Sequence, residues 1–414
     1  DAEGNNINWN NSYYSNPYFT AYENTVGQIR NRIIGNVELN YKIIDGLSAN
    51  FRTGNDYYTD RRKIKISYGT NGTPFGSYEE DAYTFNENNT EGRLNYSKAI
   101  SDDFNFDILL GGNIRTTTFE NNNQKAQKLA VAGLYTLSNS RDPLLSSNIY
   151  TKQKVYSAFS SAQLGFRNYA YLNLTARNDW SSTLPAANRS YFYPSVNASF
   201  ILTEAFDIKS DVLNFAKIRG GWSKVGKDAT PYQLLNTYNF TAPFDGNPQQ
   251  GINAIELNPN LKPETTNSTE AGVELGFFKN RLRLDLGVYN TNSIDQILNL
   301  DVSPTTGFSS KLVNGGTINN KGIEAILGLT PVKTDHFSWD IDLNYSLNRS
   351  KVKALYENVQ SFVLGTDGTV QVLATIGQPY GTLFGTAYER NAAGDILVEA
   401  DGTPAISASK KILG

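Results

Sequence analysis

The chain has 414 residues, no cysteine, one histidine and a formal net charge of −3 from 37 basic and 40 acidic residues. The missing cysteines exclude disulfides, thiolate metal sites and cysteine nucleophiles, and the single His336 excludes a zinc site built from several histidines. The balanced charge gives no basic field for nucleic acid. We therefore expect no cofactor, no metal and no nucleic-acid partner.

Hydropathy excludes a helical membrane protein but not a membrane protein built from strands. Mean hydropathy is −0.43, and no run of about 18 apolar residues marks a spanning helix. A membrane-spanning β-strand alternates lipid-facing with lumen-facing residues, so its average hydropathy is polar. Tyrosine (25 residues) and phenylalanine (21 residues) lie among abundant Asn, Ser, Thr and Gly, which is typical of strands and turns.

Alternation of apolar and polar residues with period two recurs along the chain and predicts β-strands. In the clearest stretch, 336–348, Trp339 and Leu343 fall on one face while Asp340 and Asn344 fall on the other. We count about a dozen such strands, most of them near the ~10 residues that a tilted membrane strand needs. Soluble sandwiches use ~5–6 residues. The other clear stretches, in chain order, are 33–43, 104–110, 156–166 and 282–289.

The connectors between these strands alternate in length. Short links are expected at Asp45-Gly46, 101–103, Lys279-Asn280 and 332–335, and long polar connectors at 59–90, 118–152, 226–264, 292–320 and 350–382. Short turns at one end and long loops at the other are typical of bacterial outer-membrane barrels. The stretch 203–213 is expected to be an elaborated periplasmic turn. We predict an all-β fold, an antiparallel transmembrane β-barrel of the outer membrane.

A series of short motifs resembles the SusC/RagA family of TonB-dependent transporters. The stretch from Asn258 to Thr266 is similar to the family's NPxLKPETT motif, and the resemblance extends over about 30–414, most strongly at 258–352. We assign its positions a structural role rather than a catalytic one. They are Pro259, Leu261, Lys262, Pro263 and Glu264, followed by Gly307 and Phe308 of a Thr-Gly-Phe motif and Gly322 of an Asn-Lys-Gly-Ile-Glu motif.

The resemblance implies an active importer in the outer membrane of a Bacteroidota bacterium. A family barrel has ~22 strands, a size that holds a plugged lumen, so residues 1–414 are expected to be part of the TonB-dependent receptor β-barrel domain. The plug, the amino-terminal β-domain and the carboxy-terminal closing strands of the family are expected to lie outside these residues. The implied function is TonB-dependent import of a large nutrient, an oligosaccharide or a peptide, with TonB acting through the plug region and a SusD-like surface lipoprotein as lid.

Arg177, Asp179 and Trp180 end one predicted strand on the loop side and are the candidate substrate-binding residues. The indole of Trp180 suits stacking on a sugar ring, and it equally suits the aromatic girdle at the membrane interface. Carboxylates such as Asp285 and Asp340 face a wet lumen in this arrangement. A glycosidase needs two carboxyls at a fixed separation, one of them in an apolar pocket. These carboxylates are expected to be solvated lining of the lumen instead, so we expect no enzyme.

Alternatives stay open for the proline motif and for the function. The segment between Pro259 and Pro263 is either a loop scaffold or a strand initiator, since proline cannot enter a central ladder. The chain also suits a passive porin, a barrel-bearing adhesin, or a soluble carbohydrate-binding or hydrolytic β-protein. Arginine in place of Leu284 is expected to cost ~2–4 kcal/mol if that residue faces lipid, whereas arginine at Asp285 is expected to be mild.

Overall fold

Strands dominate the computed structural model, which describes residues 6–8 and 14–413. The predicted domain over 1–414 therefore includes some residues outside the described part of the chain. Among the described residues, no helix is both long and apolar enough to cross a membrane. The helical elements are α1 (Pro17–Glu23), η1 (Leu137–Asn139), α2 (Leu202–Ala205) and η2 (Pro304–Thr306).

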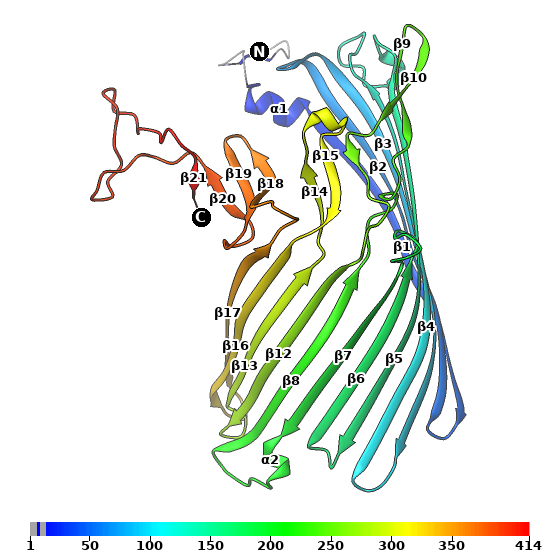
Figure 1. Cartoon of the computed structure of the whole chain (residues 1–414), viewed down its shortest axis with the longest axis vertical. Coiled ribbons are helices and arrows are strands. Elements are labelled where there is room, and N and C mark those ends of the chain that lie inside the picture. Colours follow the sequence, from blue (N-terminus) through cyan, green and yellow to red (C-terminus); the bar gives the residue numbers. More distant parts are fainter. Residues whose placement is uncertain (1–5, 9–13, 414) are drawn as a thin grey trace. The chain divides into compact units, whose positions relative to one another are not determined.

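Most of the strands are longer than the predicted alternating stretches (Figure 1). In chain order they are β1 (Thr25–Ile44), β2 (Leu47–Thr70), β3 (Thr73–Ala99), β4 (Phe104–Ala126), β5 (Leu145–Phe166), β6 (Ala170–Ser181), β7 (Ser190–Ile201), β8 (Leu213–Lys227), β9 (Tyr238–Phe244), β10 (Asn247–Ile252), β11 (Ile255–Glu256), β12 (Glu264–Phe277), β13 (Leu282–Ile294), β14 (Ile297–Asp301), β15 (Ser310–Asn314), β16 (Thr317–Lys333), β17 (Ser338–Ala354), β18 (Ser361–Asp367), β19 (Val370–Thr375), β20 (Thr382–Gly385) and β21 (Lys411–Ile412).

The chain divides into two compact units. The first contains Asp1–Ile43, Ser48–Arg93 and Gly111–Tyr156, and the second contains Ile44–Leu47, Leu94–Leu110 and Ser157–Gly414. Strands β1 to β5 are hydrogen-bonded in that order in the first unit. In the second unit the order continues from the later half of β5 through β6, β7, β8, β12, β13, β16 and β17. The twelve strands follow sequence order, which confirms the predicted all-β antiparallel fold.

In the first unit, alternation separates an apolar face from a hydrogen-bonded polar face. On the polar face the buried carboxylate of Asp60 accepts hydrogen bonds from Gln28 (2.6 Å), from Arg30 (2.6 and 2.9 Å) and from Arg62 (3.3 Å). On the apolar face Ile33 of β1 is 73% exposed. Large apolar side chains left uncovered along a whole strand indicate a surface that meets lipid or further protein.

The second unit repeats this division with a register that sets the two faces. Leu284 of β13 lies opposite Leu275 of β12 and Leu327 of β16, and Leu327 in turn lies opposite Leu343 of β17. Directly opposed residues of an antiparallel pair point to the same face, so these four leucines form one apolar surface. Leu343 is 55% exposed. A one-residue slip would turn this surface to the polar side.

The predicted long connectors are partly wrong. The stretch 59–90 lies mostly in β2 and β3, which are joined by a tight link at 71–72, and the connector expected at 118–152 shrinks to 127–144. The other three also contain strands, from β9 to β11, in β14 and β15, and from β18 to β20. Where a strand extends beyond the lipid, neither face needs to be apolar, and so the alternation that signals a strand disappears.

The short turns were predicted well. Gly46 has φ +78°, the left-handed conformation that glycine adopts without strain, and it follows Asp45 in the link between β1 and β2. The link expected at 332–335 lies at 334–337 instead. The stretch 203–213 contains most of α2 and lies between β7 and β8, so it is the elaborated turn that the sequence predicted.

Two neighbouring turns of the second unit are joined by an ion pair. Arg167 Nε lies 2.7 Å from Asp103 Oδ1, and this hydrogen bond holds the pKa of the Asp103 carboxyl below its ordinary value. A lowered carboxyl pKa contributes stability above the ordinary pKa, and that contribution is lost as the pH falls through the lowered value. Both side chains are solvent-exposed, so the contribution is small.

Candidate functional site

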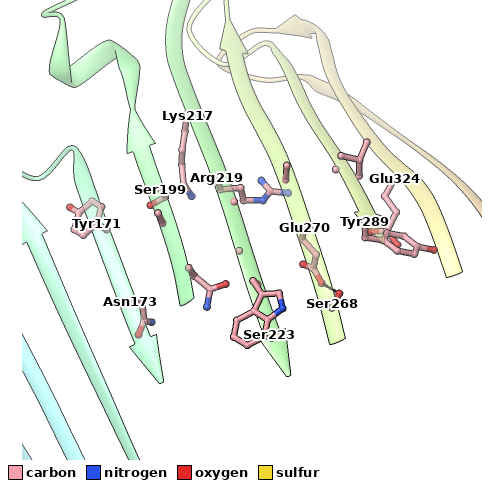
Figure 2. Close-up of a pocket in the computed structure, with 18 of the residues that line it drawn as sticks. Tyr171, Asn173, Ser199, Lys217, Arg219, Ser223, Ser268, Glu270, Tyr289 and Glu324 are labelled. Atoms are coloured by element: carbon pink, nitrogen blue, oxygen red, sulfur yellow. Dashed lines mark hydrogen bonds between the residues drawn. The ribbon is translucent and has the colours of Figure 1, made fainter. Parts of the chain in front are cut away.

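The polar face of the second unit contains a hollow of about 700 Å³. Residues from β5, β6, β7, β8, β12, β13 and β16 surround it, and Figure 2 shows many of them on neighbouring strands. Its charged and aromatic lining residues are Tyr171, Lys217, Arg219, Trp222, Glu270, Tyr289 and Glu324. The hollow is therefore lined by cations, carboxylates and phenol rings together.

The strand register places several glycines on the polar face beside this hollow. Gly272 of β12 lies directly opposite Gly287 of β13, and Gly221 of β8 lies opposite Glu270 of β12. These glycines project no Cβ, and side chains of other strands lie over two of them, Arg219 over Gly272 and Asn197 over Gly221. Glycine inside a strand often marks a place where another group approaches the backbone closely.

One of these glycines lets a long side chain cross a whole strand. Arg219 of β8 donates to Glu274 Oε1 of β12 at 2.6 Å and to Asp285 Oδ1 of β13 at 2.7 Å. A Cβ at Gly272 would lie 2.9 Å from Arg219 Cζ, so the guanidinium lies flat over this glycine. Lys217 also contacts Glu274, at 3.2 Å. The result is a paired charge network at the edge of the hollow.

The same arrangement recurs twice across β16. Tyr289 of β13 lies over Gly322 and donates its hydroxyl hydrogen to Asn348 Oδ1 of β17 at 3.1 Å. A Cβ at Gly322 would clash with the Tyr289 ring. Arg283 passes over Gly328, where a Cβ would lie 2.9 Å from its Nη2 atom, and reaches Asp342 at 3.4 Å. Gly322, a residue of a predicted motif, therefore leaves room for the Tyr289 ring to cross β16.

Gly272→Ala is expected to lower the free energy of unfolding by ~1–3 kcal/mol, the usual cost of overpacking. The new methyl group would meet both the Arg219 guanidinium and the Leu286 carbonyl oxygen, at 2.9 and 3.0 Å. The control is Gly287→Ala, because the nearest atom to a Cβ there lies 4.0 Å away. Urea unfolding followed by tryptophan fluorescence measures both variants, and equal midpoints would contradict the crossing role of Gly272.

The structure brings together two of the three predicted substrate-binding residues. Arg177 Nε donates to Asp179 Oδ1 at 2.8 Å, and Arg177 Nη2 donates to Ser157 Oγ at 2.8 Å. Asp179 is buried and also accepts a hydrogen bond from the Tyr193 hydroxyl. Trp180 lies on the opposite face of β6, across from Ser190 of β7, and is 38% exposed. Alternation within the strand separates it from the other two.

The proline motif lies at the centre of a small apolar cluster. Leu261 is fully buried and packs with Leu184, Ala229 and Leu312. Leu184 and Ala229 lie in connections and Leu312 lies in the short strand β15, so Leu261 packs against three segments that are distant in the sequence. This is the scaffold expected as one alternative for the segment.

Backbone contacts around the motif also fit the other alternative, strand initiation. Asn314 accepts a hydrogen bond from the Lys262 N–H at 2.8 Å and donates to the Lys262 carbonyl at 2.9 Å. Pro263 directly precedes β12, whose first residue, Glu264, accepts from the Ile297 N–H at 3.0 Å and from Lys227 at 3.1 Å. Pro259 stands two residues before Leu261. The segment therefore both starts a strand and holds loops.

The Thr-Gly-Phe motif caps a short helical turn. Gly307 ends η2 in the left-handed conformation, with φ +86°, and its N–H donates to the Pro304 carbonyl at 3.0 Å. The Phe308 N–H donates to Thr306 Oγ1 at 3.3 Å. The role is local and structural. Within the described part of the chain, no group of three or more His, Cys, Asp or Glu residues could hold a metal ion.

Sequence reasoning missed the hollow and the glycines beside it. Glu270, Glu324 and Tyr289 belong to polar faces that the alternation predicted, but nothing in one strand tells which residues of the next strand lie beside it. The available signal was the presence of glycines at regular positions within strands, which marks close approach.

The sheet has twelve antiparallel strands, and strands with one apolar and one polar face are typical of proteins that span a membrane with β-strands. The family described as TonB dependent receptor-like, beta-barrel, matches residues 1–395. The chain therefore belongs to this family, and it is an outer-membrane protein.

Relatives of known name agree with this assignment. TonB-dependent receptor P26 of Formosa agariphila is 31% identical over 362 residues, 82% of this chain and 36% of that protein. TonB-dependent receptor SusC of Bacteroides thetaiotaomicron is 24% identical over 338 residues, 78% of this chain and 33% of that protein. The predicted SusC/RagA resemblance is confirmed. These relatives are receptors and not enzymes.

The fold is also shared with a solved transporter. The RagAB peptide importer in its closed-closed state superposes with a TM-score of 0.80 and 20% identity, over 96% of this chain and 46% of that one. The chain thus spans less than half the length of these relatives.

Proposed function

We propose that the full-length protein imports a large polar nutrient, an oligosaccharide or a peptide, across the outer membrane with work supplied through TonB. The observation that carries this proposal is membership of the TonB-dependent receptor family together with a polar face that contains a hollow lined by charged, amide and hydroxyl side chains. Hydroxyl, amide and charged groups around the hollow match the donors and acceptors of sugars and peptides. A similar fold serves a peptide importer, which supports the peptide alternative.

The partners belong to the same proposal. A SusD-like surface lipoprotein would cover the outer end, and TonB would act through a plug region of the full-length protein. SusC is among the relatives by sequence. Purification of the full-length protein from outer membranes is expected to recover one lipoprotein in equal amount, and purification without any lipoprotein would contradict the lid.

Arg177 and Asp179 are proposed to contact the nutrient. They alternate with Leu174 and Trp180 and so share the polar face of β6 with Tyr171 and Asn173, which line the hollow. Trp180 lies on the apolar face of the strand, and that position fits the alternative of an interfacial aromatic.

Uptake by the producing bacterium tests this function. Deletion of the full-length gene is expected to abolish uptake of either a labelled oligosaccharide mixture or a labelled peptide mixture, and a protonophore is expected to abolish it equally in the wild type. Uptake that survives the protonophore would indicate a passive porin. Unchanged uptake after deletion would contradict import altogether.

Single variants in the same assay test the proposed contacts. Arg177→Gln is expected to raise the half-saturating nutrient concentration several-fold, because it removes a charged donor from the polar face. Arg189→Gln is the matched control, since Arg189 is an exposed arginine in the link after β6. An equal effect of both substitutions would contradict the role of Arg177.

A further inference from the structure

The basic groups of the hollow on the polar face of the second unit are already neutralised. Its two cations are Lys217 and Arg219. Arg219 contacts Glu274 at 2.6 Å and Asp285 at 2.7 Å. Lys217 contacts the same Glu274 at 3.2 Å. Two cations therefore face two carboxylates at the edge of the hollow, and the formal charges of this network cancel.

Two further carboxylates line the hollow outside this network. They belong to Glu270 of β12 and Glu324 of β16, and both residues are exposed. Glu270 accepts a hydrogen bond from the Ser268 hydroxyl at 3.2 Å. Among the residues that the structure describes, neither Glu270 nor Glu324 forms an ion pair. The hollow thus has two carboxylates in excess of its cations, and both are accessible to a ligand.

The strand register places these two glutamates on either side of β13. Glu270 lies opposite Tyr289, and Glu324 lies opposite Gly287, two residues earlier on the same face of β13. Figure 2 shows both glutamates near the Tyr289 ring. Two strand spacings and one two-residue step separate their Cα atoms by roughly 12 Å. Because of this separation, a ligand needs two basic groups to reach both carboxylates.

The uncharged lining groups suit the backbone of a peptide. Asn173 of β6 lies opposite Asn197 of β7, and Ser268 of β12 lies opposite Thr291 of β13. All four residues line the hollow. Amide and hydroxyl groups both donate and accept hydrogen bonds, so they match the N–H and C=O groups of a peptide. The long side chains of lysine and arginine can reach carboxylates at some distance from that backbone, whereas the amino group of an amino sugar is attached directly to the ring.

We propose that the hollow selects basic peptides, and that Glu270 and Glu324 each bind the ammonium or guanidinium group of one lysine or arginine side chain. The proposal rests on the import function proposed above and narrows its substrate. An ion pair between exposed groups contributes up to about fivefold in affinity. A peptide with acidic side chains would meet repulsion from the same two carboxylates.

Isothermal titration calorimetry of the full-length protein, purified from outer membranes in a mild detergent, tests this charge selection. The probes are three synthetic octapeptides in which glycine alternates with lysine, with glutamine or with glutamate. The lysine peptide is expected to bind roughly twentyfold more tightly than the glutamine peptide, and the glutamate peptide more weakly than both. Raising the salt concentration from about 0.1 M to about 1 M is expected to remove most of this difference, because salt screens exposed charges.

Glu270→Gln and Glu324→Gln are each expected to lower the affinity for the lysine peptide about fivefold and to leave that for the glutamine peptide unchanged. The double variant is expected to bind both peptides equally. Glu204→Gln is the matched control, since Glu204 is an exposed glutamate of α2, between β7 and β8, and does not line the hollow. If the double variant does not fold, the two single variants decide the result.

Equal affinity of the wild type for the lysine and glutamine peptides would overturn the charge selection and would leave import itself standing. Tighter binding of a glucosamine oligomer than of the lysine peptide would assign the two carboxylates to an amino sugar and would overturn the proposal as well. So would the absence of binding by all three peptides. Import itself is contradicted by a different result, which is unchanged nutrient uptake after deletion of the full-length gene.

Discussion

Replacing Leu327 by arginine is expected to cost ~2–4 kcal/mol and to block assembly in the membrane, the usual penalty for a charge on the lipid face near the midplane. Leu327 lies between Leu284 and Leu343 on the apolar surface of the second unit. The effect is measured by folding the full-length protein into lipid vesicles against urea and by its heat-modifiable gel mobility.

Ile326→Arg is the matched control for this substitution. Ile326 is the adjacent residue of β16, is equally apolar and is 50% exposed, but it faces the polar side, opposite Asp285 and Asn344. We expect it to be tolerated. Similar losses for the two substitutions would refute the assignment of the faces.

The structure also corrects the control suggested by the sequence. Arginine at Asp285 was expected to be mild, but Asp285 accepts a hydrogen bond from Arg219 at 2.7 Å. Removing this carboxylate leaves a guanidinium without one of its two partners, and a new arginine beside it adds repulsion. Asp285 is therefore not a suitable site for a control substitution that should have only a mild effect.

Leu261→Ala is expected to destabilise the loop cluster by ~2–5 kcal/mol, the range for truncating a fully buried leucine. The cluster is small, so the loss should open the loops locally while the strands persist. Hydrogen–deuterium exchange of the full-length protein is expected to rise at 182–189, 228–236 and 295–316 and to stay unchanged in β12 and β13.

The comparison for this prediction is Leu235→Ala. Leu235 belongs to one of the same connections but is 72% exposed, so the same truncation should leave exchange unchanged. A uniform rise over strands and loops in Leu261→Ala would show that the residue supports the sheet rather than the loops.

Much of the twelve-stranded sheet was predictable from the sequence, because the alternation that indicates its strands lies within each strand. Alternation with period two reports which side of a strand meets lipid, and this appears in the sequence of each strand alone. It correctly separated Leu343 from Asn344. It failed at 59–90 because a strand outside the lipid has no reason to alternate.

The ion pairs of Arg219 on the polar face were not predictable, because they depend on contacts between strands. Whether Arg219 reaches Asp285 depends on the register of β8 against β12 and of β12 against β13, and on the absence of a side chain at Gly272. No single strand contains this information. The same holds for Trp180, which is adjacent in sequence to Asp179 but on the opposite face of the strand.

The sequence by itself determined that the chain forms antiparallel membrane strands with one apolar face, and its motifs pointed to the SusC/RagA type, because hydrophobic period and turn residues are properties of neighbouring positions. Only the tertiary structure decided where the polar residues meet. The glycine crossings, the loop cluster around Leu261 and the hollow all depend on contacts between residues distant in sequence, and these are fixed by strand register and packing.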